Sequence, residues 1–96
     1  MLVRSGWNRD VIYVPERVAE DLAGFRARFD AWLYNPETPH GYWRDVNEEF
    51  GSFRALEYDS AEAFTRWLTE HVIEPGERAY VATYVAPDAS MPELYF

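Results

Sequence analysis

A helical repeat of apolar side chains between Pro15 and Tyr34 dominates the sequence. Its members follow one another at alternating spacings of four and three residues, in the order Val18, Leu22, Phe25, Phe29 and Trp32. Because an α-helix turns once in about 3.6 residues, this spacing places them on one helix face. Asn35 and Pro36 end the pattern, since the residue before a proline is pushed out of the α region. The sequence therefore predicts an amphipathic helix over 15–34 that covers a core.

A second helix is predicted from Ser60 to about Ile73. Asp59 or Ser60 can cap it, and Glu62 lies in its first turn, where a carboxylate is favourable. Its inner face carries Phe64, Trp67, Leu68, His71 and Val72. Pro75 then turns the chain.

Three runs rich in β-formers predict strands over 10–14, 52–58 and 79–86. The segment 42–50 is ambiguous: its apolar spacing fits a short helix closed by Gly51, although two glutamates are unfavourable at a helix C-terminus. The resulting order of elements predicts an α+β fold. We expect a small two-layer domain, in which a sheet of about three strands, mixed or antiparallel, carries two main helices on one face.

Length and composition favour one folding unit. The chain has 96 residues, of which 48% are hydrophobic, and no change in composition divides it. The sequence therefore predicts a single domain over 1–96. Residues 87–96 contain two prolines and an apolar end, so they form either a docked extension or a segment that binds a partner.

Cysteine and lysine are both absent, and all nine basic residues are arginines. A small secreted domain without cysteine would lack the disulfides that such domains commonly need. No apolar run has the length of a signal peptide or a membrane span, so we expect a cytoplasmic protein without membrane contact. A chain without lysine cannot form a Schiff base or supply the lysine of a phosphate-binding loop. No cofactor is predicted.

The negative charge belongs to the later part of the chain. The net charge is −8 at pH 7; residues 1–34 hold five arginines and five acids, whereas residues 35–96 hold four arginines and twelve acids. Direct binding of nucleic acid is disfavoured, because phosphate contacts depend on neutralisation by lysine and arginine.

Acid–base catalysis would have to use Glu70, His71 and Glu74, which lie within about one helical turn. A partly buried histidine beside an apolar stripe is the plainer interpretation of His71, and His40 lies in a turn where a lone histidine is usually only solvated. Two histidines without cysteine, and without an HExxH or EF-hand pattern, predict no metal site. No serine lies in a G-x-S-x-G pattern. The sequence therefore predicts a protein that is not an enzyme.

Residues 45–77 form the densest acidic segment, with nine acids and two arginines. One interpretation is solubility, for which a solvated acidic face is sufficient. The other is that carboxylates on a rigid surface imitate DNA phosphates and occupy a basic channel. The candidate partner-binding residues are Asp45, Glu48, Glu49, Glu57, Asp59, Glu62, Glu70, Glu74 and Glu77, with Tyr42 and Trp43 as aromatic anchors. These aromatic side chains can equally form a peripheral core.

The leading hypothesis is a small acidic inhibitor that binds a protein with a basic, nucleic-acid-binding surface and blocks it by charge mimicry, as a monomer or homodimer. Phage inhibitors of CRISPR or restriction enzymes and bacterial immunity proteins act in this way, and the analogy rests on charge and size alone. The first alternative is a structural or adaptor domain that docks a partner or a second copy through aromatic surface, an apolar tail or a sheet edge. The second is a small enzyme that uses glutamate and His71.

Overall fold

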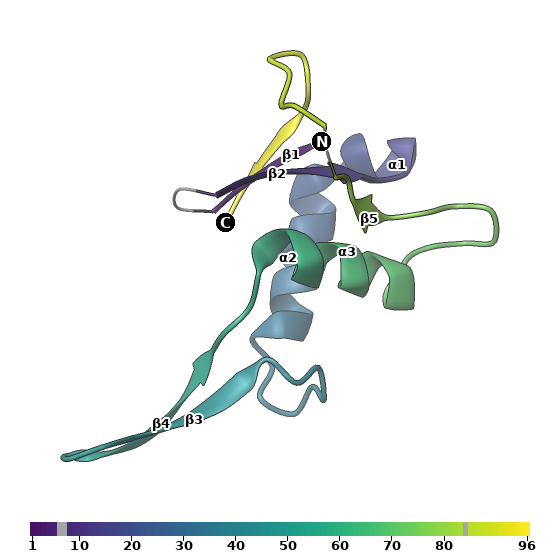
Figure 1. Ribbon diagram of the computed structural model, residues 1–96. Coiled ribbons are helices and arrows are strands. Elements are labelled where there is room, and N and C mark those ends of the chain that lie inside the picture. Colours follow the sequence, from purple (N-terminus) through teal and green to yellow (C-terminus); the bar gives the residue numbers. More distant parts are fainter. Residues whose placement is uncertain (6–7, 84) are drawn as a thin grey trace.

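The computed structural model describes residues 1–5, 8–83 and 85–96. Within them the chain forms three helices, a four-stranded sheet and a two-stranded sheet (Figure 1), which confirms the predicted α+β composition. The elements in chain order are β1 (Leu2–Ser5), β2 (Asn8–Tyr13), α1 (Glu16–Ala19), α2 (Leu22–Leu33), β3 (Trp43–Glu48), β4 (Gly51–Leu56), α3 (Ser60–His71), β5 (Tyr80–Val81) and β6 (Glu93–Tyr95). No helix of this described part is long and apolar enough to cross a membrane.

The four-stranded sheet has the order β5-β2-β1-β6. β1 and β5 pair antiparallel with β2, and β6 runs parallel to β1, so the C-terminal segment docks as an edge strand. Phe96 completes this pairing by donating its N–H to the carbonyl of Arg4 at 2.9 Å. The predicted sheet of about three strands therefore differs from the structure. β1 and β6 are only four and three residues long, too short for an alternating pattern to stand out.

The predicted strands over 10–14 and 79–86 are found only in part. The first begins earlier and includes Asn8–Tyr13, because it forms a hairpin with β1. In the second, only Tyr80–Val81 pairs with β2. Tyr84, inside the predicted range, lies outside the described residues.

The predicted helix over 15–34 is interrupted between α1 and α2. Asp21 caps α2, and its carboxylate accepts the N–H of Gly24 at 3.2 Å. A side chain at Gly24 would meet that carboxylate, since a Cβ there would lie 2.5 Å from Oδ2 of Asp21. The apolar stripe nevertheless faces the core as predicted, with Phe25 and Phe29 buried.

The prediction of a second helix near 60–73 is confirmed by α3, which Asp59 caps by accepting the N–H of Glu62 at 3.0 Å. Its buried face meets Phe29 of α2, whose ring packs edge-on against Phe64 with centroids 5.3 Å apart. Phe96 adds a third ring, 5.7 Å from Phe29. α3 also contacts β1, β2 and β5. The core thus lies between the sheet and the two longer helices (Figure 1).

The segment 42–50, whose sequence is ambiguous, does not form the short helix that its apolar spacing fits, because Trp43–Glu48 forms β3. The spacing of Trp43, Val46 and Phe50 fits a helical face, but pairing with β4 satisfies the backbone of this segment instead. Cross-strand pairing of this kind is not visible in a local apolar pattern. The predicted strand 52–58 corresponds to β4, Gly51–Leu56.

Candidate functional site

A β-hairpin formed by β3 and β4, residues 43–56, extends away from the helices and the four-stranded sheet (Figure 1), and we call it the arm. Its strands pair antiparallel from Trp43 opposite Leu56 to Glu48 opposite Gly51, so that residues 49 and 50 form the turn. Gly51 adopts φ 149°, a conformation that residues with a side chain rarely adopt. Among the described residues, β3 and β4 pair only with each other, which leaves both outer edges of the arm open.

Exposed aromatic side chains mark the outer part of the arm. Phe50 in the turn is 96% exposed, and Phe53 in β4 is 50% exposed. Phe53 lies opposite Val46, so the two share one face of the hairpin. A hairpin of two strands is only marginally stable in water by itself. Exposed apolar side chains that gather on one element, as they do on the arm, are typical of an interaction site.

The other face of the arm carries polar cross-strand contacts. Arg54 lies 3.8 Å from the carboxylate of Asp45, and its guanidinium lies 5.3 Å from the ring centroid of Trp43. Ser52 donates a hydrogen bond of 2.7 Å to the side chain of Asn47. Exposed contacts of this kind contribute only ~0 to 1 kcal/mol each, so they support the register of the hairpin more than its stability.

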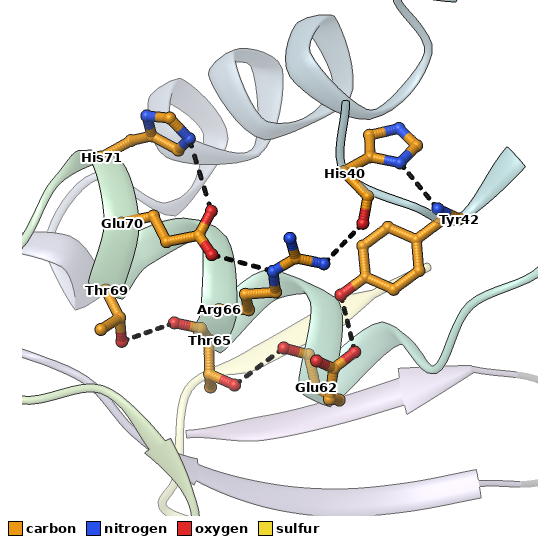
Figure 2. A network of polar contacts seen from close by, with 8 residues as sticks. All are labelled: His40, Tyr42, Glu62, Thr65, Arg66, Thr69, Glu70 and His71. Atoms are coloured by element: carbon orange, nitrogen blue, oxygen red, sulfur yellow. Dashed lines mark hydrogen bonds and ion pairs between the residues drawn. The ribbon is translucent and has the colours of Figure 1, made fainter. Parts of the chain in front are cut away.

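The base of the arm is held to α3 by a polar network around Arg66 (Figure 2), which we call the brace. Tyr42 donates its hydroxyl to Glu62 at 2.8 Å. Arg66 donates to the carbonyl of His40 at 2.6 Å and to the carboxylate of Glu70 at 2.9 Å. The guanidinium of Arg66 also lies 5.2 Å from the ring centroid of Tyr42. Four side chains and the backbone carbonyl of His40 thus fix the chain where it enters β3.

The charge states of the brace follow from its contacts. The hydrogen bond that Arg66 donates to Glu70 raises the pKa of Arg66, so the guanidinium stays charged. Burial raises the pKa of Tyr42, so its hydroxyl keeps its proton for Glu62. The brace therefore combines one cation and one neutral donor with two carboxylates.

His40 is a buried member of the brace, with 3% of its surface exposed. Its Nε2 lies 2.9 Å from the carbonyl oxygen of Leu33, and its Nδ1 accepts the N–H of Tyr42 at 2.9 Å. Because a carbonyl oxygen only accepts, Nε2 carries the proton and the ring is neutral. Both ring nitrogens thus bind backbone groups, and neither is free for proton transfer to a substrate.

The structure distributes the nine predicted acidic residues over the arm, its base, the later part of α3 and the loop after α3. Asp45, Glu48 and Glu49 lie on the arm, Glu57, Asp59 and Glu62 follow at its base, and Glu70 lies later on α3. Glu74 and Glu77 lie in the loop after α3, which Figure 1 shows well away from the arm's turn. No single patch holds all nine.

Most of these carboxylates have partners inside the chain. Ion pairs join Asp45 to Arg54, Glu57 to Arg44, Glu70 to Arg66 and Glu77 to Arg17. Asp59 caps α3 and Glu62 accepts from Tyr42. Glu48, Glu49 and Glu74 have no ion-pair partner among the described residues. Glu48 and Glu49 are therefore the arm's uncompensated charges.

Glu77 is held most tightly. Arg17 of α1 donates to both of its carboxylate oxygens, at 2.7 and 3.0 Å, and also to the carbonyl of Val72 at 2.8 Å. The hydrogen bonds that Glu77 accepts from Arg17, and a further one from the N–H of Glu74, lower the pKa of Glu77 to about 2. Glu77 therefore clamps the loop after α3 to α1.

The two predicted anchors have their polar atoms engaged within the chain. Both Tyr42 and Trp43 are half-buried. Trp43 donates its ring N–H to the carbonyl of Asn35 at 3.3 Å. Both side chains thus hold the base of the arm.

The acid–base alternative rests on His71. Its Nε2 lies 3.8 Å from a carboxylate oxygen of Glu70, whose other oxygen binds Arg66. A cavity of about 170 Å³ beside it is lined by Trp32, Thr38, Pro39, His40, Arg66, Glu70 and His71. Among the described residues, no group of three or more His, Cys, Asp or Glu side chains could hold a metal ion.

Comparison with known proteins finds no relative: no protein-family model, no curated protein and no solved structure matches the chain. The side chains that sequence reasoning missed are Phe50 and Phe53. Gly51 after a two-residue turn, between two runs with β-forming side chains, is the signal that could have indicated the hairpin.

Proposed function

We propose that this protein is a small acidic inhibitor that binds a basic, nucleic-acid-binding protein through its arm and blocks that protein by charge mimicry. The observation that carries the proposal is the turn of the arm. There Glu48 and Glu49 have no ion-pair partner among the described residues, and Phe50 between them and β4 is 96% exposed. A projecting element with this chemistry fits a basic cleft with an apolar floor.

The distribution of charge along the arm supports a basic partner. Asp45, Glu48 and Glu49 all lie in β3 and the turn, whereas β4 has no acid. The net charge of −8 adds a long-range attraction toward a positive surface. Such attraction speeds association and weakens with added salt.

The aromatic side chains of the arm have two roles in this proposal. Phe50 enters the partner's cleft, since its side chain is 96% exposed. Tyr42 and Trp43 hold the base, where their polar atoms bind Glu62 and the backbone of Asn35. An arm held in one orientation loses less conformational entropy on binding than a free loop would.

The experiment is capture of a partner on the immobilised protein, followed by purification of that partner and a nucleic-acid-binding assay. We expect a partner with a basic surface, released by raised salt, whose binding to nucleic acid falls when this protein is added. The double variant Glu48→Arg and Glu49→Arg should lose capture. Its matched control reverses two exposed acids beside α1, Glu16→Arg and Glu20→Arg, and should retain it.

Two results would reject the proposal. One is capture that survives reversal of the arm's turn but fails in the α1 control. The other is a captured partner whose nucleic-acid binding is unaffected at saturating amounts of this protein.

A structural or adaptor role is the second candidate, and a separate surface favours it. Tyr13 and Tyr80 stack at the β5 edge of the sheet, with centroids 5.2 Å apart, and both are about half exposed. Beside them is a cavity of about 390 Å³ lined by Tyr13, Pro15, Gly76, Glu77, Arg78 and Tyr80. Docking there would be apolar, so capture would survive high salt and would be lost in Tyr80→Asp.

A further inference from the structure

The outer edge of β4 carries backbone groups that β3 does not use. Glu57 donates its N–H to the carbonyl of Tyr42 at 3.0 Å, which fixes the alternation of hydrogen-bonded pairs along the hairpin. Gly51, Phe53 and Ala55 therefore bond to β3. Ser52, Arg54 and Leu56 direct their N–H and C=O groups away from it, along about 14 Å of strand.

The composition of this edge is unusual for a strand left open. Edge strands are commonly protected by charged side chains, proline or a covering element. β4 reads GSFRAL, with Arg54 as its only charge and no proline. β3 carries three charged side chains, Arg44, Asp45 and Glu48, so two β3 edges would bring more charges together than two β4 edges would. In a molecule with a net charge of −8, β4 is therefore the edge that another copy can approach.

We infer that two copies of this chain associate through their β4 edges, antiparallel, and form a four-stranded arm sheet. Only residues that direct their backbone groups outward can exchange hydrogen bonds across this edge. In the register centred on Phe53, Ser52 pairs with Arg54 of the second copy, and Phe53 lies opposite the second copy's Phe53. The register centred on Arg54 would set two guanidinium groups opposite each other, which is unfavourable. The register centred on Phe53 instead brings two aromatic rings together in a non-hydrogen-bonded pair, where side chains are closest.

This pairing stabilises the arm, since an isolated hairpin of two strands is only marginally stable. A hairpin of two strands becomes a sheet of four, and the apolar faces of both arms, each with Val46 and Phe53, become continuous. Both β3 strands, with Asp45 and Glu48, lie at the outer edges of the joined sheet. The inference goes beyond the proposed function and does not depend on it, because β4 meets the second copy while the acids of β3 stay available to a basic partner.

The salt dependence of self-association has the opposite sign to that of partner binding. Two copies of charge −8 repel each other, so added salt should strengthen the dimer. In sedimentation experiments over a concentration series, we expect reversible dimers that increase between low and high salt. A protein that stays monomeric at about 100 µM in high salt would overturn the inference.

A matched pair of variants locates the contact. Phe53→Asp should weaken the dimer about tenfold or more, because it sets two carboxylates opposite each other. Tyr80→Asp changes a side chain of the same exposure, 48% against 50%, at the β5 edge and should leave the dimer unchanged. Dimers that survive Phe53→Asp and vanish in Tyr80→Asp would contradict the inference.

Cysteine substitution tests the register directly, since the natural chain has no cysteine. Phe53→Cys should form an intermolecular disulfide on mild oxidation, because the two Cα atoms would lie about 4.5 Å apart. Ala55→Cys should not, because its two copies would lie about 14 Å apart along the sheet, beyond the ~7 Å limit for a disulfide. Equal crosslinking at both positions, or crosslinking only at 55, would reject this register.

Discussion

The hydroxyl of Tyr42 donates a hydrogen bond of 2.8 Å to the carboxylate of Glu62, and so joins the first residue before the arm to the first turn of α3. Glu62 thus accepts the hydrogen bond that holds the start of the hairpin against α3. The same helix turn is capped by Asp59. The orientation of the arm therefore depends on how α3 begins.

Removal of that hydroxyl should loosen the base of the arm. We expect Tyr42→Phe to lower the free energy of unfolding by about 1 kcal/mol, the usual contribution of one such hydrogen bond. Amide exchange in β3 and β4 should become faster. Tyr80→Phe is the control, because the hydroxyl of Tyr80 has no hydrogen-bond partner among the described residues. Equal unfolding curves and exchange rates for both variants would show that the Glu62 contact is unimportant.

Substitution should destabilise the protein at His40 and leave its stability nearly unchanged at His71. His40→Leu leaves the carbonyl of Leu33 and the N–H of Tyr42 without their buried partner. We expect the free energy of unfolding to fall by about 2 to 3 kcal/mol. His71→Leu changes an exposed side chain and should stay within ~0.5 kcal/mol of the unchanged protein. Chemical denaturation measures both, and a neutral His40→Leu would contradict the buried role of that ring.

Alanine substitutions at two phenylalanines should distinguish an effect on stability from an effect on partner binding. Phe29→Ala opens the core against Phe64 and Phe96, and should cost about 3 to 5 kcal/mol of unfolding free energy. Phe50→Ala removes an almost wholly exposed ring and should change stability by less than ~0.5 kcal/mol. Capture of the partner should nevertheless weaken strongly in Phe50→Ala. Full capture by a folded Phe50→Ala protein would remove Phe50 from the proposed site.

The clamp between Arg17 and Glu77 should give a pH-dependent contribution to stability. The pKa of Glu77 is lowered from 4.5 to about 2 by the hydrogen bonds of Arg17 and the N–H of Glu74. The folded protein therefore binds fewer protons at this group than the unfolded chain does. The stabilisation is present above about pH 4.5 and is lost as the pH falls toward 2.

Unfolding measured as a function of pH tests this clamp. The difference in stability between the unchanged protein and Glu77→Gln should be constant above about pH 5 and should shrink as the pH falls toward 2. Glu16→Gln, an exposed acid on α1 without an ion-pair partner among the described residues, is the control and should show no such trend. Parallel pH profiles for the unchanged protein and Glu77→Gln would contradict the clamp.

The sequence predicts helices more completely than strands in this protein because helical signals are local. The stripe from Val18 to Trp32 and the cap at Asp59 each lie within a few turns of the segment they specify. β1 and β6 lack such a signal, since the pairing of Leu2 with Glu93 joins residues at opposite ends of the chain. Strand pairing across such separations depends on tertiary contacts.

The candidate site illustrates the same limit. The acidic residues can be counted from the sequence, but their ion pairs cannot: Glu77 with Arg17 joins positions far apart in the chain. Glu48 and Glu49 become distinctive only because β3 and β4 pair and hold them at a projecting turn. The spacing of Phe50 and Phe53 gave no indication that both would be exposed.

Amide hydrogen exchange of this protein, with and without its captured partner, tests the central claim most directly. If the arm is the binding element, residues 43–56 should gain protection in the complex, strongest around Phe50, while the β5 edge near Tyr80 stays unchanged. Protection confined to the β5 edge or to the loop after α3, with the arm exchanging as fast as in the free protein, would contradict it.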